Sequence, residues 1–287
     1  MDSLDGVVET GLPRDDPTAF LESPWGDAGR AAVLAAVAAA CKLGLTVANT
    51  LAARGGARER LVDAVTSREP GRGLVTVSNH TSTLDDPALF AALLPLSLFA
   101  TDPLTGRVRW SLCAREVCFK GRVLADFFRA GKTLPVERGA GPAQPSTAAA
   151  GAALAAGGWV HMFPEGRIGY GGGVLPARWG VGALVCDCVA RGAPAPLLLP
   201  LFHSGMGDVM PRGARVPRVG KRVTVVAGKE VGLADLVPGC AARDPRPAWA
   251  AIAARVEAAL VELEAEAPPN ADQRRPGDAP PRARRRA

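Results

Sequence analysis

Short apolar runs alternate with segments of helical periodicity along most of the chain. Buried strands are predicted where residues are almost continuously apolar, at 74–77, 159–163, 196–202 and 222–227. Helical spacing or small-residue composition predicts helices at 58–67, 87–94, 121–130, 148–156, 178–190 and 246–267. Residues 95–101 and 110–119 are interpreted as mixed strand and loop, and 131–139 as a turn, a short extended piece and a second turn. Because strands alternate with helices, the pattern predicts an α/β fold with a mixed, partly parallel sheet flanked by helices.

The first apolar segment, residues 31–53, is longer than these runs. It is long enough to span a bilayer, yet it is rich in alanine and carries Lys42 near its middle. We expect a membrane-associated helix that lies in the interface or enters without crossing. A spanning helix and a soluble buried helix are the alternatives. The acidic residues 1–30 place no basic region ahead of the apolar segment, which argues against a secretory signal or an Arg-rich presequence.

The remaining chain divides into a main domain at 58–240, an amphipathic helix at 246–267 and a tail at 268–287. The tail is rich in proline and arginine, and we expect it to be disordered. It contains six arginines and two aspartates, a net +4 of the chain's +6, which leaves +2 for all other residues. A basic tail could contact nucleic acid or an anionic membrane surface. We interpret it as a solvated tail and expect no nucleic-acid partner.

The cysteines and histidines do not form a metal-binding pattern. None of the six cysteines belongs to a CxxC pair, and the three histidines add no zinc-type spacing, so we expect no metal and no cofactor. Cys186 and Cys188 lie in an apolar run and are interpreted as core residues. The cysteine spacing does not resemble a disulfide framework, although it does not exclude disulfides.

Polar residues follow three of the predicted strands, at Asn79-His80, Glu165-Gly166-Arg167 and His203-Ser204. Sites in open α/β sheets form at the carboxyl ends of strands, so these residues are candidates for one pocket. His161 alternates with apolar neighbours inside a strand and is interpreted as structural.

His80 and Asp85 are the strongest candidates for catalytic residues. Pro87 suits the first turn of a helix, with Asp86 as its N-cap, and this leaves Asp85 five residues from His80 across the turn. A histidine is the commonest general base near neutral pH, and a carboxylate can fix its tautomer. The pair is therefore either a dyad that deprotonates a hydroxyl group or a capped helix beside a structural histidine, and this stretch alone does not decide between them.

Other candidates are weaker when taken singly. Arg138 follows an extended segment, and its guanidinium group could grip a phosphate or form a surface salt bridge. Glu165, in a Pro-Glu-Gly turn, is either a ligand-binding carboxylate or a turn residue. The glycine-rich residues 169–173 match neither phosphate-binding glycine pattern and are interpreted as a flexible loop. The chain contains no GxSxG, so a hydrolase serine is not supported.

Four blocks of the sequence, taken in order, resemble the motifs of the glycerolipid acyltransferase superfamily. They are Asn79-His80-x4-Asp85, Gly131…Pro135-Val136-x-Arg138-Gly139, Phe163-Pro164-Glu165-Gly166 and the apolar strand around Pro200. Flanking residues resemble the tafazzin branch: Asp85-Asp86-Pro87, Gly158-Trp159-Val160-His161, Arg178-Trp179-Gly180-Val181-Gly182 and Pro200-Leu201-Phe202-His203-x-Gly205-Met206-x-Asp208-Val209. The resemblance covers roughly residues 70–235.

This resemblance implies an O-acyltransferase with His80 as general base and Asp85 as its orienting carboxylate. Arg138, Glu165, Gly166 and Arg167 fall on the acceptor-binding motifs. The tafazzin branch implies transfer of acyl chains between phospholipids and lysophospholipids without coenzyme A, with cardiolipin, lysocardiolipin and phosphatidylcholine as partners. It further implies a peripheral or monotopic protein of the mitochondrial outer or inner membrane, facing the intermembrane space.

The sequence differs from the tafazzin branch at two places, and two other functions are alternatives. Thr81 stands where the branch has glutamine, and a glycine-rich loop follows Arg167. The same motifs fit an acyl-CoA-dependent lysophospholipid O-acyltransferase of the 1-acylglycerophosphate or 1-acylglycerophosphocholine type. A membrane-binding protein without catalysis would need the apolar helix and the basic tail but no dyad.

Overall fold

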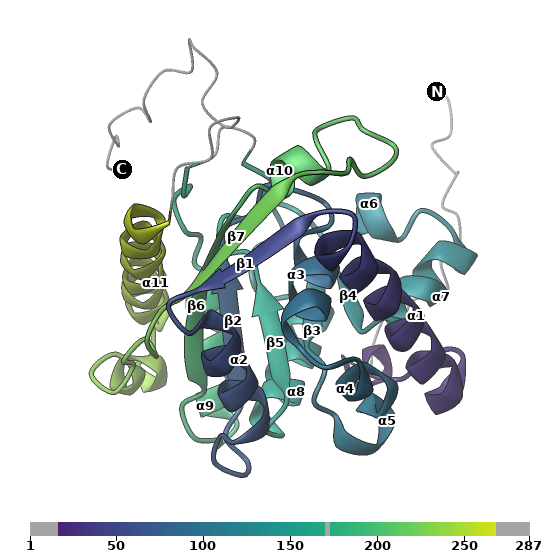
Figure 1. Cartoon of the computed structure of the whole chain (residues 1–287). Coiled ribbons are helices and arrows are strands. Elements are labelled where there is room, and N and C mark those ends of the chain that lie inside the picture. The colour runs from purple at the N-terminus through teal and green to yellow at the C-terminus, as the bar shows by residue number, and fades with distance from the viewer. Residues whose placement is uncertain (1–16, 170–172, 268–287) are drawn as a thin grey trace, which may run out of the picture.

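A seven-stranded sheet forms the centre of the molecule. The computed structural model describes residues 17–169 and 173–267. The strands lie in the order β1-β7-β6-β2-β5-β3-β4, and every neighbouring pair is parallel except β6 and β7. Their bounds are β1 Thr50–Arg54, β2 Leu74–Ser78, β3 Trp110–Ala114, β4 Thr133–Val136, β5 Trp159–Met162, β6 Leu197–Ser204 and β7 Arg222–Ala227. The predicted α/β fold with a mixed, mostly parallel sheet is confirmed (Figure 1).

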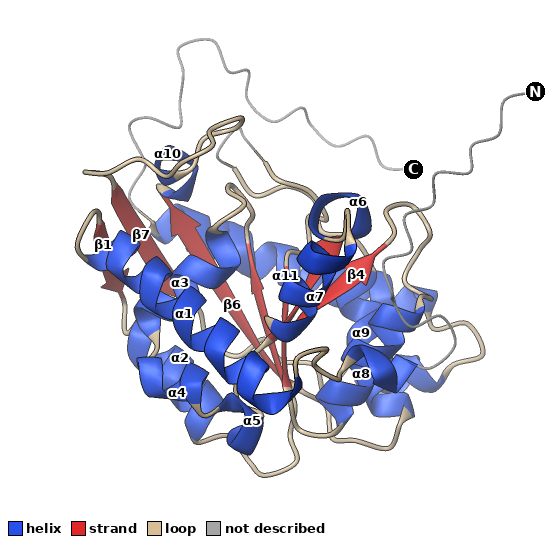
Figure 2. Ribbon diagram, turned by 90° about the vertical axis from the view of Figure 1, so that its right-hand side faces the viewer, coloured by secondary structure: helices blue, strands red, loops and turns tan. Residues whose placement is uncertain are grey.

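Helices cover both faces of the sheet (Figure 2). Leu74 and Leu199 face a cluster with α1 to α4, whereas Val75 and Leu198 face a second cluster with α8, α9 and α11. Successive residues of a strand point to opposite faces, so strands buried on both faces appear as continuous apolar runs. The helices are α1 Gly26–Thr46, α2 Ala57–Thr66, α3 Asp85–Leu93, α4 Leu96–Ala100, α5 Asp102–Thr105, α6 Arg115–Cys118, α7 Arg122–Ala130, α8 Pro145–Ala155, α9 Gly180–Ala190, α10 Met206–Val209 and α11 Arg246–Glu266, with 3-10 turns at Pro17–Phe20 and Val237–Ala241.

The N-terminal apolar helix differs in extent from the predicted 31–53. It begins at Gly26 and ends at Thr46, and Thr50–Arg54 instead forms the edge strand β1 beside β7. Alanine-rich sequence does not distinguish these two states, and the partner strand β7 lies about 170 residues away along the chain. The prediction for residues 95–101 was also wrong, because Leu96–Ala100 forms the helix α4 with Leu98 and Phe99 buried.

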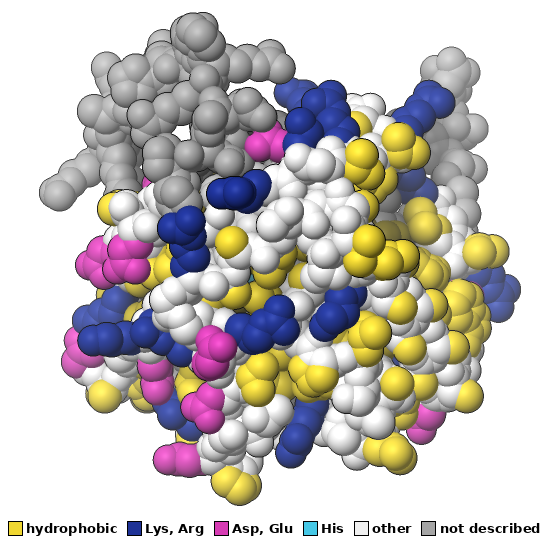
Figure 3. All heavy atoms as spheres, in the orientation of Figure 1, with side chains coloured by type: hydrophobic (Ala, Val, Ile, Leu, Met, Phe, Trp, Pro, Cys, Tyr) yellow, Lys and Arg dark blue, Asp and Glu magenta, His cyan; other side chains and the backbone are white. Residues whose placement is uncertain are grey.

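Helix α1 lies along the domain rather than apart from it. Leu34, Ala38 and Leu45 are buried, and Lys42 Nζ donates to the backbone oxygen of Leu94 at 2.8 Å. Within the described residues, α1 is the one helix that is long and apolar enough to cross a membrane, a test that buried helices of soluble proteins also pass. Hydrophobic side chains gather on the side of the molecule that carries α1 (Figure 3).

Two disulfides join cysteines that the sequence did not pair. Cys113 is bonded to Cys118, and Cys186 is bonded to Cys240 across the contact of α9 with the 3-10 turn at Val237–Ala241. Cys186 and Cys188 are both buried in the core, as predicted, and Cys188 is free. The pairing depends on a contact between residues 54 apart, which spacing alone does not reveal. Residues 1–16, residues 170–172 of the glycine-rich loop and the tail at 268–287 lie outside the described residues.

Candidate active site

His80 and Asp85 meet at the carboxyl end of β2. After β2 ends at Ser78, the chain turns within a few residues into α3, whose first residue is Asp85. His80 Nδ1 donates to Asp85 Oδ2 at 2.9 Å, and the same oxygen accepts the backbone N–H groups of Thr81 at 2.7 Å and Ser82 at 2.9 Å. The Asp85 side chain is fully buried. The predicted N-cap role of Asp86 was wrong: its carboxylate instead accepts Arg109 Nε at 2.6 Å and the Ser111 hydroxyl.

The donors around Asp85 keep it ionised. Burial alone would raise the pKa of Asp85, but the nearby His203 and the His80 hydrogen bond together hold that pKa well below its usual range. A carboxylate bound to Nδ1–H fixes the tautomer of His80, so Nε2 is the nitrogen left to accept a proton. The His80 ring also stacks on Phe163, with ring centroids 3.8 Å apart and planes 12° from parallel. This is the geometry of an oriented general base.

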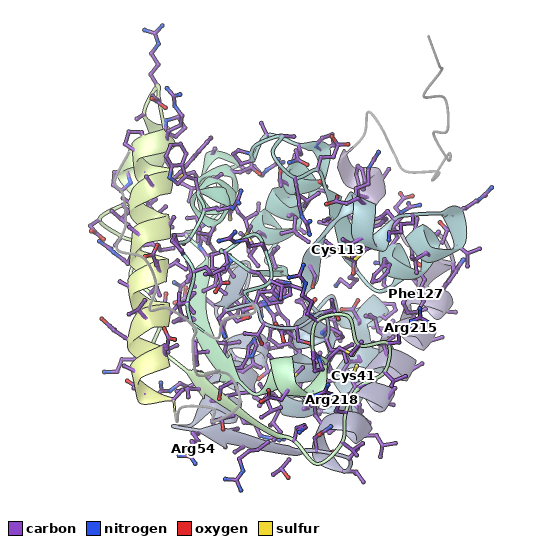
Figure 4. All side chains as sticks on the ribbon, turned by 90° about the horizontal axis from the view of Figure 1, so that it is seen from above. Cys41, Arg54, Cys113, Phe127, Arg215 and Arg218 are labelled. Carbon is purple, nitrogen blue, oxygen red and sulfur yellow. A yellow bond between two sulfur atoms is a disulfide. The ribbon has the colours of Figure 1, made fainter. Side chains whose placement is uncertain are left out.

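His80 lines a large cavity whose walls are mostly apolar. The cavity has a volume of about 1830 Å³ and runs between α1, β3, α7 and α9. Cys41 of α1, Cys113 of β3 and Phe127 of α7 line it from three elements, as seen from above in Figure 4. Val33, Val37, Leu112, Phe128 and Leu184 add further apolar surface. Such a cavity beside a base suits a long apolar substrate chain.

The structure separates the other predicted site residues into two groups. Arg138, Gly166 and Arg167 line the cavity together with His80. Arg138 is exposed, and its Nη1 lies 3.0 Å from Glu116 Oε1, so it forms the surface ion pair that was the alternative interpretation. Arg178, which the sequence did not single out as a binding residue, also lines the cavity. It crosses the turn where a side chain at Gly166 would lie 2.8 Å from Arg178 Cδ, and Gly166 has φ +65°, so this position favours glycine.

Glu165 does not line the cavity, although its neighbours Pro164 and Gly166 do. Its side chain is 2% exposed, and neither carboxyl oxygen has a hydrogen-bond partner of good geometry among the described residues. Burial raises the pKa of Glu165 to about 8, a rise that the nearby backbone N–H groups of Leu175 and His80 reduce only in part. Glu165 is therefore a neutral carboxyl group at pH 7.

Two further histidines lie close to the pair. His161 is buried, with Nδ1 2.9 Å from Thr76 Oγ1, and burial lowers its pKa to about 4, which agrees with a structural role. His203 Nε2 lies 3.5 Å from Asp85 Oδ2, with both side chains fully buried. The position of His203 at the end of a strand was the one signal in the sequence that pointed to this contact. Within the described residues, no three His, Cys, Asp or Glu side chains are placed to hold a metal ion.

Comparisons with known proteins identify the family of this chain. The model of the acyltransferase family matches residues 60–204, half of the chain. Tafazzin of Drosophila melanogaster is 36% identical over 212 residues, 73% of this chain and 54% of the fly protein. N-acylphosphatidylethanolamine synthase of Arabidopsis thaliana is 37% identical over 182 residues, 60% of this chain and 61% of the plant protein. The chain thus spans between half and two thirds of the length of these two relatives.

A solved structure supports the fold independently. The 1-acyl-sn-glycerophosphate acyltransferase PlsC of Thermotoga maritima superimposes with a TM-score of 0.54, covering 83% of this chain and 80% of that protein at 19% identity. At this identity the likeness concerns the fold alone. The family match and the His80–Asp85 pair lead to one conclusion: the chain belongs to the acyltransferase family, with tafazzin among its relatives.

Proposed function

We propose that the protein transfers fatty acyl chains between phospholipids and lysophospholipids without coenzyme A. The observation that carries this proposal is the orientation of His80. Its Nδ1 is bound to a buried carboxylate, and its ring lines an apolar cavity large enough for lipid chains. The likeness to tafazzin supports a lysophospholipid as the acceptor.

In the proposed mechanism, His80 Nε2 takes the proton from a hydroxyl group of the lysophospholipid. The oxygen then attacks the ester carbonyl of a donor phospholipid, and a new ester bond forms as the old one breaks. The imidazolium form of His80, stabilised by Asp85, returns its proton to the departing oxygen, so the products are a phospholipid and a lysophospholipid. No acyl group has to reach the enzyme as a thioester.

Arg138 and Arg167 are proposed to hold the phosphate of the acceptor at the cavity rim. Both side chains are exposed and line the cavity, and a phosphate could replace Glu116 as the partner of Arg138. Gly166 would let the backbone approach the head group. Glu165 is proposed to act through the shape of the turn, since it does not line the cavity. Cardiolipin and lysocardiolipin as preferred lipids rest on the tafazzin likeness alone.

We propose that the protein lies on a membrane surface as a peripheral or monotopic protein. The side with α1 and α7 exposes Leu43, Val47 and Val123, which are 61%, 74% and 80% exposed. Arg215 and Arg218, labelled in Figure 4, are exposed in the segment between α10 and β7 and suit anionic head groups. A mitochondrial membrane is the proposed location by likeness to tafazzin.

A lipid-exchange assay tests the proposal. The full chain is mixed with vesicles of acyl-labelled phosphatidylcholine and lysocardiolipin, and the products are identified by mass. We expect transfer without coenzyme A and none with His80→Ala. The control is His161→Gln, which replaces a buried histidine that does not line the cavity. Vesicle sedimentation shows whether each variant still binds membranes.

Other outcomes select the alternatives. Transfer only after acyl-CoA is added would replace the proposal with an acyl-CoA-dependent lysophospholipid acyltransferase. Membrane binding without transfer from any donor would indicate a non-catalytic protein. The Arabidopsis relative motivates one more acceptor, phosphatidylethanolamine, because a histidine base can also deprotonate an ammonium group. An N-acylated product would assign the plant relative's reaction to this chain.

A further inference from the structure

His203 and Asn79 tie the carboxyl ends of β6 and β2 together. Asn79 Nδ2 donates to the backbone oxygen of His203, and Asn79 Oδ1 accepts the backbone N–H of His203, both at 2.9 Å. The His203 ring adds a third contact, with Nε2 2.9 Å from the backbone oxygen of Asn79. Three contacts between residues 124 apart hold the His203 ring in one place beside Asp85.

These contacts determine which nitrogen of His203 carries the proton. A backbone oxygen only accepts, so Nε2 must be the donor nitrogen. His203 Nδ1 is buried and has no hydrogen-bond partner among the described residues, so a second proton there would be an unsatisfied N–H group. The Nε2–H of His203 therefore lies 2.9 Å from the backbone oxygen of Asn79 and 3.5 Å from Asp85 Oδ2.

We propose that His203 is a positioning residue for the acyl transfer: its Nε2–H draws charge from Asp85 and thereby keeps His80 in its basic form at lower pH. It touches no substrate, and it acts through the carboxylate. All the donors that reach Asp85 converge on Oδ2, because Oδ1 has no partner among the described residues. This inference rests on the proposed function only for its kinetic readout.

The direction in which the acid limb moves follows from the charges that face His80 and Asp85. Without the His203 N–H group, Oδ2 carries more negative charge, which favours the imidazolium form of His80. The base is then present only at higher pH, so the acid limb of the rate profile moves upward. The other titratable groups around this set are Glu165 after β5, His161 in β5 and Asp86 at the start of α3, which pairs with Arg109 before β3. Besides burial, His203 helps to lower the pKa of His161, so this group also responds when His203 is replaced.

The tautomer can be measured without any activity. The chain has three histidines, so 15N-histidine labelling with a histidine-free purification tag yields three ring systems. Loss of one ring in each of the variants His80→Gln, His161→Gln and His203→Gln assigns them. We expect His203 as the Nε2–H tautomer and His80 as the Nδ1–H tautomer near pH 7. A His203 ring protonated on Nδ1 alone would overturn the proposal, because Nε2 would then carry no hydrogen to donate to Asp85.

Kinetics of two variants test the effect on the reaction. His203→Leu removes the donor, and we expect the acid limb of kcat/KM to rise by roughly half a pH unit, which lowers kcat/KM on that limb by roughly threefold. His203→Gln keeps an N–H group within reach and should restore most of both. His161→Gln, the matched buried histidine on the neighbouring strand β5, should lower the thermal unfolding temperature without moving the acid limb.

The outcomes separate this inference from the proposed function. An unmoved acid limb in both His203 variants, with the fold intact, would reduce His203 to a structural residue. If His203→Leu does not fold, the tautomer of the wild-type ring and the pH profile of His203→Gln still decide the question. If the wild type transfers no acyl group from any donor, the proposed function fails, and the ring signals still report whether His203 donates to Asp85.

Discussion

Two buried carboxyl groups beside His80 have opposite protonation states. Asp85 follows β2 and is fully buried, and its pKa lies well below the usual range. Glu165 follows the adjacent strand β5 and is 2% exposed, and its pKa is raised to about 8. Burial acts in the same direction on both groups. The difference must therefore come from the donors that each carboxyl group receives.

The local backbone explains this difference in donors. Asp85 is the first residue of α3, so the N–H groups of Thr81 and Ser82 in the preceding turn converge on Oδ2 beside the two histidine rings. Glu165 sits in a turn closed by the hydrogen bond from Gly166 N to the backbone oxygen of Phe163. Its side chain points under Gly169 and Leu175, where the described residues offer no well-aligned donor. Asp85 is thus the charged partner of His80, and Glu165 is a buried, protonated carboxyl group.

Of the substitutions at these two carboxyl groups, the one that removes the charge of Asp85 should lower the transfer rate most. Asp85→Asn offers an amide N–H to His80 Nδ1, which favours the wrong tautomer, and we expect the transfer rate to fall on the order of 10³-fold. The initial rate in the lipid-exchange assay measures this loss, with thermal unfolding as the control for the fold. A lowered pKa contributes stability that is present above the unfolded value and lost as pH falls, so the variant should also lose less stability than the wild type below about pH 4. A loss of less than tenfold in a folded variant would contradict the assignment.

Asp85 makes the protein lose stability as pH falls, whereas Glu165 should make it lose stability as pH rises. Its pKa of about 8 exceeds the ordinary value of 4.5, so the folded protein keeps a proton that the unfolded chain has released between these values. Stability is then lost as pH rises toward 8, by roughly 2 kcal/mol between pH 6 and pH 8 relative to Glu165→Gln. Urea unfolding of both proteins across this range measures the difference. Parallel curves would show that Glu165 is ionised in the folded state.

The same substitution should have little effect on the reaction. Glutamine matches a protonated glutamate in shape, and the carboxyl group does not line the cavity, so we expect kcat/KM at pH 7 to change by no more than about threefold. Arg138→Ala serves as the comparison, because its exposed guanidinium group lies on the lining and should mainly raise KM. A large loss with Glu165→Gln would mean that the carboxyl group turns toward the acceptor when substrate binds.

The sequence predicts the pairing of Asp85 with His80 better than it predicts the surroundings of Glu165. Strands β2, β5 and β6 are buried on both faces, so they appear as apolar runs, and the polar residues at their ends indicate the site. The spacing of His80 and Asp85 is local and spans a single turn. Their pairing is therefore visible in the sequence, and the family motifs strengthen it.

What the sequence does not show depends on contacts between distant segments. The edge strand β1 exists because β7 pairs with it, and Cys186 finds Cys240 through the packing of α9. The partner of Asp86 is Arg109, 23 residues away. The Glu165 carboxyl group lies close to Gly169, and the spacing of residues in the sequence does not reveal this direction of its side chain. Glu165 thus matches a binding motif although it does not line the cavity.

A hydrogen-bond donor placed beside Glu165 should lower its pKa, as the donors around Asp85 lower the pKa of that residue. A Cβ atom at Gly169 would lie 3.3 Å from Glu165 Oε2 and 3.1 Å from the flexible end of Leu175, so a small side chain fits after a slight shift. In Gly169→Ser the hydroxyl group can donate to the carboxylate, which lowers the pKa of Glu165 and should reduce the loss of stability between pH 6 and pH 8 by about 0.5 kcal/mol. Gly169→Ala adds the same Cβ without a donor and is the matched control in urea unfolding. If serine and alanine give the same pH dependence, then burial and not the missing donor sets the state of Glu165, and the contrast with Asp85 would need another cause.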